Sequence, residues 1–212
     1  GDKLFCREAY TDAAAVLEHI ENIGPCVDAL LAEGVATLDE ISLHGPSAEL
    51  DKCKEKCDPF GMQYYQIDSG FSTITKEVGG IPSGQRLVSI QPTFTVQSWE
   101  KAKPIMAEFV EKTSKEGDVI FYGWTTNGDK LFCREAYSSG KGVLRHLENV
   151  GPCVEALLAD GVATLDRIEL HGPMGQVQEC KQAMDAFGTT YFNVDSGFQR
   201  YECIKLGGFM SK

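Results

Sequence analysis

The sequence predicts an α+β fold built from two copies of one unit, and three observations lead to this prediction. Residues 1–10 return unchanged as residues 128–137. The match continues without a gap, so that residues 1–71 and 128–198 are identical at 44 of 71 positions. In the second copy, segments with the alternating pattern of strands are interleaved with segments of helical periodicity. A repeat of this length indicates a duplicated domain and not a solenoid of short repeats.

The complete copy begins with a predicted strand at residues 87–96, in which apolar and polar residues alternate. Pro92 lies inside this strand and predicts an edge position or a bulge, because proline cannot donate to the strand ladder. Ser98 is a typical cap for the next helix, whose apolar residues recur until Gly117. Pro104 predicts either a kink in this helix or its true start.

Two further strands, at residues 118–125 and 131–137, form a predicted hairpin. Both are rich in β-branched and aromatic residues, and Asn127-Gly128 lies between them. This dipeptide is typical of two-residue hairpin turns, whose central residues need positive φ angles. The sequence therefore predicts two antiparallel strands that turn at Asn127 and Gly128.

The copy continues with a helix at residues 143–157, a strand at 164–171, a short helix at 177–188 and a strand at 191–194. Gly151-Pro152 inside the long helix predicts a kink or two abutting helices. Strands that are joined through helices form one sheet with its helices on one face. The other face is also apolar in places, and a second sheet of the same kind would cover it.

The first copy is shorter than the second. Residues 1–75 lack counterparts of the first strand, the first helix and the second strand of the complete repeat at 86–198. Residues 76–85 are rich in glycine and predict a linker, and residues 199–212 form a tail that resembles its beginning. The chain has the pattern of a slice from a longer tandem array. We expect a preceding strand–helix–strand segment, either upstream in the natural protein or on another chain.

Composition and cysteine usage exclude several classes of function. The net charge of -11 disfavours binding to nucleic acid or to an anionic membrane. No apolar run reaches the roughly 18 residues of a membrane span. The eight cysteines include no Cys-x-x-Cys pair; buried free thiols in an intracellular, reducing compartment are predicted, with a disulfide framework or a zinc site as the alternative. No dinucleotide, phosphate-loop or catalytic zinc motif is present, so no cofactor and no metal site are predicted.

Three stretches and the order of elements carry a family resemblance. The stretches are Cys-Arg-Glu-Ala-Tyr at residues 133–137, His-Leu-Glu-Asn-Val-Gly-Pro at 146–152 and Leu-His-Gly-Pro at 170–173. Each unit thereby resembles the antibiotic-biosynthesis-monooxygenase-like group of the dimeric α+β-barrel superfamily. The resemblance implies tandem ferredoxin-like units that pair their antiparallel sheets into an α+β barrel, with a small apolar pocket between sheet and helices. Members include cofactor-free oxygenases, haem-degrading enzymes and proteins without known activity, and the fold does not choose among them.

His146 and its counterpart His19 are the candidate catalytic residues. Each flanks the apolar stripe of its helix, with Asn149 or Asn22 on the same side. A histidine at the edge of a pocket can act as a general base near neutral pH. The alternative is a structural histidine beside the Gly-Pro of the helix, because the sequence places no nucleophile or carboxylate next to it.

Aromatic residues in both copies are candidate ligand contacts. They are Trp124, Tyr137, Tyr191, Tyr10 and Tyr64. Packing within the sheet and core is the alternative for each of them. Gln91, Trp124 and His146 also invite comparison with the Asn, Trp and His of the haem-degrading members. Glutamine stands where that pattern has asparagine, and Trp124 lies on a different strand, which disfavours haem.

Two other patterns have structural interpretations. His44 and His171 each end a strand before Gly-Pro, without companions at metal-ligand spacing, so we expect turn histidines that bond nearby backbone. Arg134 and Glu135, and the same pair in the first copy, point to opposite faces of one strand. Cross-strand ion pairs are expected for them.

Two functional hypotheses follow. The first is a small-molecule-binding protein that resembles cofactor-independent monooxygenases, with a small apolar or aromatic ligand and oxidoreductase activity. The second is a non-catalytic structural or interaction module, which self-associates or packs on neighbouring repeats. A pocket of roughly 300 Å³ or more with convergent polar groups favours the first hypothesis, and a filled core favours the second.

Overall fold

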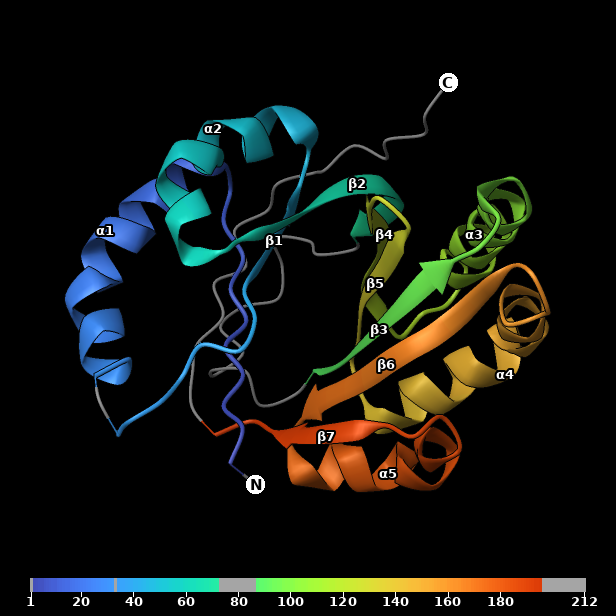
Figure 1. Ribbon diagram of the computed structural model, residues 1–212. Helices are drawn as coiled ribbons and strands as arrows, with labels where there is room; N and C mark the ends of the chain where they lie inside the picture. The colour runs from blue at the N-terminus through green and yellow to red at the C-terminus, as the bar shows by residue number, and fades with distance from the viewer. Residues whose placement is uncertain (1, 33, 73–86, 196–212) are drawn as a thin grey trace. The chain divides into compact units, whose positions relative to one another are not determined.

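The computed structural model describes residues 2–32, 34–72 and 87–195 of the chain (Figure 1). The chain divides into two compact units, Gly1–Ile67 (unit 1) and Asp68–Lys212 (unit 2), and each is described by itself. Helices and strands are mixed along the chain, which confirms the predicted α+β class. The predicted linker at 76–85 and tail at 199–212 lie outside the described residues.

Unit 2 contains the complete set of predicted elements. In chain order they are β3 (Val88–Val96), α3 (Trp99–Thr113), β4 (Val119–Asn127), β5 (Lys130–Tyr137), α4 (Gly140–Leu157), β6 (Ala163–Gly172), α5 (Met174–Asp185) and β7 (Thr190–Asn193). The strand order is β4-β5-β3-β6-β7, antiparallel from β4 to β6 and parallel between β6 and β7. The first six elements form a ferredoxin-like unit, with α3 and α4 on the same side of the sheet (Figure 1).

The end of strand β2 (Gln63–Ser72) lies beside β4 in unit 2. Gly70 has a φ angle of +148°, and a Cβ atom at this position would lie 2.3 Å from the carbonyl oxygen of Tyr122. Any other residue would collide with the backbone of β4. Glycine is therefore required where these two strands approach each other.

Strand β3 accommodates Pro92 although it is the central strand of unit 2. It pairs with β5 on one side and with β6 on the other, so the predicted edge position is wrong. The register with β6 shifts between Thr93 and Phe94, which confirms the bulge. The register with β5 skips Gln91 and Pro92, so the ladder needs no donor at the proline.

The helices α3 and α4 each run through an internal proline. Ser98 caps α3, which begins at Trp99, so Pro104 does not mark its start. α4 continues through Pro152, and the expectation of two abutting helices is wrong. Both prolines are exposed, and so are the residues four positions earlier. Water can therefore solvate the carbonyl groups that lose a helical hydrogen bond.

The hairpin between β4 and β5 turns one residue later than predicted. Asn127 pairs with Lys130, so the two loop residues are Gly128 and Asp129. Gly128 has a φ angle of +60°, which glycine adopts without the steric penalty of other residues. The hairpin itself is confirmed.

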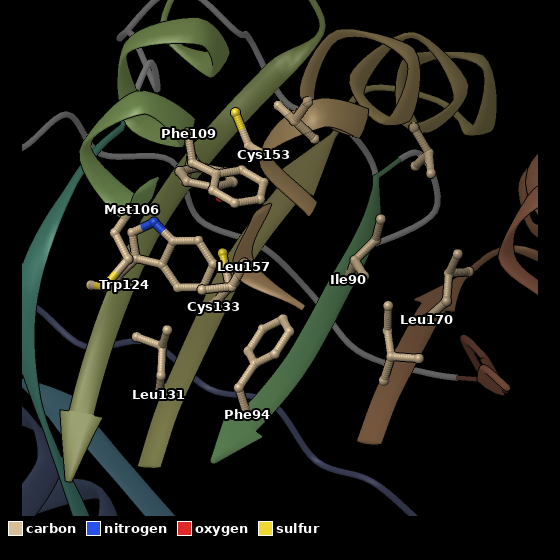
Figure 2. Packing of buried hydrophobic residues seen from close by; sticks show 14 of the residues in the cluster. Ile90, Phe94, Met106, Phe109, Trp124, Leu131, Cys133, Cys153, Leu157 and Leu170 are labelled. Atoms are coloured by element: carbon tan, nitrogen blue, oxygen red, sulfur yellow. The ribbon is translucent and has the colours of Figure 1, made fainter. Parts of the chain in front are cut away.

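The core of unit 2 fills the space between the sheet and the helices (Figure 2). The ring of buried Trp124 meets Phe109 at 5.4 Å and Tyr122 at 5.8 Å between centroids, both nearly edge-on. Figure 2 shows Trp124 next to Met106 and Phe109 of α3. Edge-to-face contacts of this kind are favourable beyond the area that they bury, so Trp124 links α3 to the sheet.

Unit 1 repeats the second half of this topology. It contains α1 (Ala13–Leu30), β1 (Ser42–Gly45), α2 (Ser47–Cys57), the 3-10 helix η1 (Asp58–Phe60) and the beginning of β2. β1 and β2 are parallel, as are β6 and β7. Local contacts recur as well: the hydroxyl of Tyr64 donates to Asp58 at 2.7 Å, and that of Tyr191 donates to Asp185 at 2.7 Å.

The cysteines of the described residues are all free thiols. Those at positions 53, 57, 133, 153 and 180 are buried, as predicted, but Cys6 and Cys26 of unit 1 are exposed. The prediction of burial is therefore wrong for these two residues. None of the described helices combines the length and the apolar character that a membrane crossing requires.

Candidate active site

Helix α4 carries His146 into the space between the helices and the sheet. Ser139 caps this helix, and its hydroxyl accepts a hydrogen bond from the backbone N–H of Gly142 at 3.1 Å. His146 is buried on the same helix face as Val143 and Val150, because residues three and four apart share a face. Its ring lies 5.0 Å from the ring of Tyr137.

Both ring nitrogens of His146 face carboxylates. Nδ1 lies 3.1 Å from Glu116, in the loop after α3, and Nε2 lies 3.3 Å from Glu135 on β5. Asn149 donates to the same oxygen of Glu116 at 2.7 Å. A neutral imidazole has one N–H donor, so it can donate to Glu116 or to Glu135 but not to both carboxylates. Both contacts are hydrogen bonds only when the cluster holds one more proton, either on the second ring nitrogen of His146 or on a carboxyl group. His146, Glu116 and Glu135 thus form a cluster that could share a proton, the proton-sharing cluster, in which His146 and Glu135 are buried and Glu116 is half-buried.

Glu135 is the most deeply enclosed acid of this cluster. It accepts a hydrogen bond from the hydroxyl of Tyr137. Burial raises the pKa of Glu135 from its ordinary value of 4.5, although His146 and Tyr137 act in the opposite direction. Burial also raises the pKa of Tyr137 well above 10.0, which keeps this phenol protonated at neutral pH.

The expected cross-strand ion pair of Glu135 is wrong. Glu135 and Tyr137 lie two residues apart on one strand, so both point toward the helices, where the carboxyl group meets His146. Arg134 points to the other face. Its buried Nε has no hydrogen-bond partner among the described residues, and burial lowers its pKa.

A small cavity lies against this cluster. Its volume is about 60 Å³. Its lining comes from the sheet and the helices: Ile90, Pro92, Phe94, Phe109, Tyr122, Trp124, Glu135, His146, Leu147, Val150, Val154, Leu158, Leu165, Ile168, Met184 and Phe187. Glu135 and His146 are the acid–base pair of this otherwise apolar wall. The cavity has room for a few water molecules but is far smaller than the roughly 300 Å³ of a typical ligand pocket.

Trp124, a lining residue of the cavity, carries a hydrogen-bond donor. Its Nε1 is buried and has no partner among the described residues. A buried donor without a partner is costly, so an oxygen atom of a ligand or a water molecule would be favoured there. Leu158 is exposed, and Leu147, Val154, Leu165 and Phe187 are half-buried, so these five side chains form the rim of the cavity.

The structure brings some of the candidate residues together and separates others. His146 and Trp124 line the cavity, whereas Tyr137 and Asn149 contact the proton-sharing cluster without lining the cavity. Tyr191 lies apart from it, where its hydroxyl donates to Asp185 at 2.7 Å and also lies 3.1 Å from the backbone carbonyl oxygen of Lys181.

Unit 1 contains a more open version of the same arrangement. Glu8 lies 3.1 Å from Nε2 of His19 and accepts from the hydroxyl of Tyr10 at 2.5 Å. His19 is half-buried and Glu8 is exposed. Among the described residues, two carboxylates flank the histidine of unit 2, whereas one carboxylate, that of Glu8, lies beside His19. Asn22 is exposed, and Tyr64 bonds to Asp58 of its own unit.

The histidines before Gly-Pro take part in ring stacking. His171 stacks on Phe192 and His44 stacks on Tyr65, with centroid distances of 4.6 Å in both pairs. In the described ranges no group of three or more His, Cys, Asp or Glu side chains is arranged to hold a metal ion. These two histidines therefore have a structural environment.

Glu116 and Glu135 are the site residues that sequence reasoning missed. Glu116 lies in a loop thirty residues before His146, and nothing local indicates their contact. Glu135 did leave a clue: it occupies an inward position of an apolar strand, between Cys133 and Tyr137. An acid on the core face of a strand needs a buried partner.

The titration of Glu135 gives a testable dependence of stability on pH. Because its pKa is higher in the folded protein than in the unfolded chain, the folded state binds more protons above pH 4.5. The free energy of unfolding should therefore fall as pH rises through this window, and Glu135→Gln should reduce that slope. Urea denaturation followed by the fluorescence of Trp99 and Trp124, both in unit 2, measures this difference.

A control for this experiment is Glu8→Gln in unit 1. Although burial raises the pKa of Glu8, hydrogen bonds from Tyr10 and Cys6 lower it below its ordinary value. The contribution of Glu8 to stability is therefore present above the unfolded-state pKa and lost as pH falls, which is the opposite sign. Because both tryptophans lie in unit 2, circular dichroism is the measurement for this variant. An unchanged slope in Glu135→Gln would contradict the raised pKa of this carboxyl.

No protein-family model and no curated protein matches the chain. Among solved structures, the chain is similar to MupZ from Pseudomonas fluorescens, with 29% identity and a TM-score of 0.50 over 57% of this chain and 99% of MupZ. A proposed monooxygenase from Fusobacterium nucleatum subsp. nucleatum matches 75% of this chain and 67% of its own, with 15% identity and a TM-score of 0.45. The similarity to MupZ supports the α+β fold predicted from the order of elements.

Proposed function

We propose that unit 2 is a small-molecule-binding, monooxygenase-like enzyme that removes a proton from a hydroxylated aromatic ligand. One observation carries this proposal: an apolar cavity wall contains a single histidine–carboxylate pair, His146 and Glu135, with 3.3 Å between Nε2 and Oε2. Both residues are buried, so a ligand that fills the cavity would meet this pair away from bulk water. The resemblance to cofactor-independent monooxygenases supports the same class of chemistry.

The cluster can accept a proton from a bound hydroxyl group. The apolar and aromatic wall would hold the ring of the ligand, with its hydroxyl against Glu135 and His146. Proton transfer to this pair places positive charge on the imidazole, next to Glu116, which Asn149 holds by a hydrogen bond. Electrostatic stabilisation of this kind is strong where water is excluded. The ring anion that remains is more electron-rich than the neutral ligand and reacts more readily with dioxygen. The ligand itself supplies the electrons: one oxygen atom enters the ring, the other leaves as water, and the hydroxylated ring becomes a quinone.

Ligand binding requires the cavity to open, since an aromatic ring needs more than 60 Å³. The rim residues Leu147, Val154, Leu158, Leu165 and Phe187 are the least buried part of its wall. Partly exposed side chains change rotamer within nanoseconds. Entry between the end of α4 and the loop after α5 therefore costs less than movement of the buried Trp124 or Met184.

The test is oxygen consumption by the protein in the presence of hydroxylated benzenes and naphthalenes, without any added cofactor. At least one compound is expected to be consumed together with dioxygen and to raise the melting temperature of the protein, since a ligand that binds only the folded state stabilises it. Absence of both effects across the panel would contradict the proposal.

A non-catalytic interaction module is the second candidate, and the small cavity volume favours it. In this case the cluster of His146, Glu116 and Glu135 fixes the position of α4 on the sheet. The oxygen experiment separates the two candidates. Turnover supports the enzyme, whereas a panel that neither reacts nor stabilises the protein supports the module.

A further inference from the structure

One sequence has two structures in this chain. Residues 2–10 are identical to residues 129–137. In unit 2 the repeated sequence forms β5, which pairs with β3 and β4. In unit 1 residues 2–10 form no strand. Leu4 is 78% exposed, and its counterpart Leu131 is 0% exposed. Local preference is the same in both places, so the difference comes from the neighbours.

A second identical segment behaves in the same way. Residues 34–39 repeat residues 161–166. In unit 2 this sequence enters β6, which pairs with β3 from Ala163 onward. In unit 1, β1 begins only at Ser42. Val35 is 63% exposed, whereas its counterpart Val162 is 6% exposed. Because β3 lies between β5 and β6, the lack of one such strand explains both losses.

The helix of unit 1 shows the third difference. In unit 2, α4 packs against α3, and Leu157 at its end is 1% exposed. Its counterpart Leu30 in α1 is 41% exposed. Cys26 is likewise exposed where Cys153 is buried. The apolar surface that α3 covers in unit 2 is therefore uncovered in unit 1.

We infer that unit 1 is a docking surface for a strand–helix–strand segment with the chemistry of residues 88–127. The first strand of the occupant would lie between residues 4–10 and β1, as β3 lies between β5 and β6. Its helix would cover α1 with an apolar face like that of Met106 and Phe109 in α3. Unit 2 is the template, since it shows the same sequence with its occupant in place.

The occupant is a further segment of this kind and not a second copy of the chain. Each chain has two such surfaces, one in each unit, but its described residues contain one strand–helix–strand segment of this pattern, which unit 2 already binds. Exchange of segments between two copies would leave as many surfaces uncovered as before. A homodimer would therefore leave this surface uncovered.

The hairpin of unit 2 shows how to supply the occupant experimentally. Asn127 pairs with Lys130 across the loop residues Gly128 and Asp129, and residues 1–3 repeat Gly-Asp-Lys. A second copy of residues 87–127 fused directly before residue 1 would thus restore the register of β4 and β5. This added segment contains no cysteine, so thiol labelling reports only on the original chain.

Labelling of the native protein with iodoacetamide tests the inference. Trypsin releases the same peptide, Leu-Phe-Cys-Arg, from both copies, and only Cys6 of the two cysteines is exposed. We expect about half of this peptide to be labelled in the 212-residue chain and almost none in the fusion. Cys26, in a peptide of its own, should lose its reactivity in the fusion as well.

The matched control is the same fusion with Met106→Asp and Phe109→Asp in the added copy only, which should leave half of the peptide labelled. A folded fusion with half-labelled peptide would overturn the inference. So would a dimeric mass of the 212-residue chain together with protection of Cys6, because a second copy would then be the occupant. If more than half of the peptide is labelled in the fusion, unit 2 has unfolded. In that case the peptide of residues 87–127 is added to the unfused 212-residue chain. Protection of Cys6 by this peptide supports the docking surface, and no protection overturns it.

Discussion

His146→Asn is expected to lower the turnover of a hydroxylated aromatic substrate by about 100-fold or more, because a positioned general base contributes roughly 10²–10⁴-fold. Asparagine retains a polar group between Glu116 and Glu135, but its amide accepts no proton at neutral pH. Binding relies on the apolar wall, so KM should change much less than kcat. Steady-state oxygen uptake over a range of substrate concentrations measures both quantities.

The chain contains its own control for this variant. His19 has equivalent neighbours, with Glu8 at 3.1 Å and the ring of Tyr10 at 5.0 Å, but lies in the open site of unit 1. His19→Asn should leave kcat nearly unchanged. An equal loss in both variants, or no loss in His146→Asn, would contradict the assignment of proton transfer to unit 2.

The stability of His146→Asn does not by itself decide between a catalytic and a structural histidine. Removal of the imidazole leaves Glu135 buried without the ring nitrogen that lies 3.3 Å away, and a buried acid without a partner destabilises the fold. A loss of about 1–2 kcal/mol in the free energy of unfolding is therefore expected for either role. The distinguishing measurement is kcat at a temperature where the variant remains folded.

The order of elements in unit 2 could be predicted because it depends on local periodicity. Alternating residues in β3 and helical spacing in α3 each report which face is buried. The same local rules gave the bulge and the hairpin, but they also allowed an edge position for Pro92 and two abutting helices at Pro152, and they placed the hairpin turn one residue too early. The conformation at these positions depends on which backbone groups face water and which residues are skipped in the pairing of two strands. Both are properties of the assembled unit and not of the local sequence.

The histidine of the site could be predicted, but its partners could not. His146 was singled out by its place beside an apolar helix stripe, which is visible in one turn of sequence. Glu116 reaches it from a loop on the far side of a hairpin, and Glu135 from a neighbouring strand. Such contacts follow from the packing of α4 on the sheet, which periodicity does not specify.

Residues 2–10 show that the local sequence alone does not determine whether a segment forms a strand. They carry the same strand pattern as β5, yet they form no strand in unit 1. A strand needs neighbours that accept and donate its backbone hydrogen bonds. The lengths of the two copies predict that the first copy lacks these neighbours, whereas the exposed conformation of this segment is visible only in the structure.

Trp124→Ala is expected to lower the free energy of unfolding of unit 2 by about 3–5 kcal/mol, the usual cost of truncating a large buried aromatic residue. The variant loses the edge-on contacts with Phe109 and Tyr122 and the contact with Phe94. Loss of the unpaired indole N–H offsets a small part of this cost. Trp99→Ala is the control and should cost less, because Trp99 is only half-buried at the start of α3. Urea denaturation followed by circular dichroism compares the two variants.

The same variant tests whether the wall beside His146 accepts an aromatic ring. Trp124 lines the 60 Å³ cavity together with His146 and Glu135, so its truncation joins the space of an indole ring to that cavity. Apolar cavities made in this way bind small aromatic molecules. Indole at about 100 times its Kd should restore about 2.7 kcal/mol of stability to Trp124→Ala and little to the unaltered protein. If the variant loses the expected stability but indole restores none, the neighbouring side chains have collapsed into the space. In that case the cavity cannot open around an aromatic ligand, and the interaction module becomes the better account of unit 2.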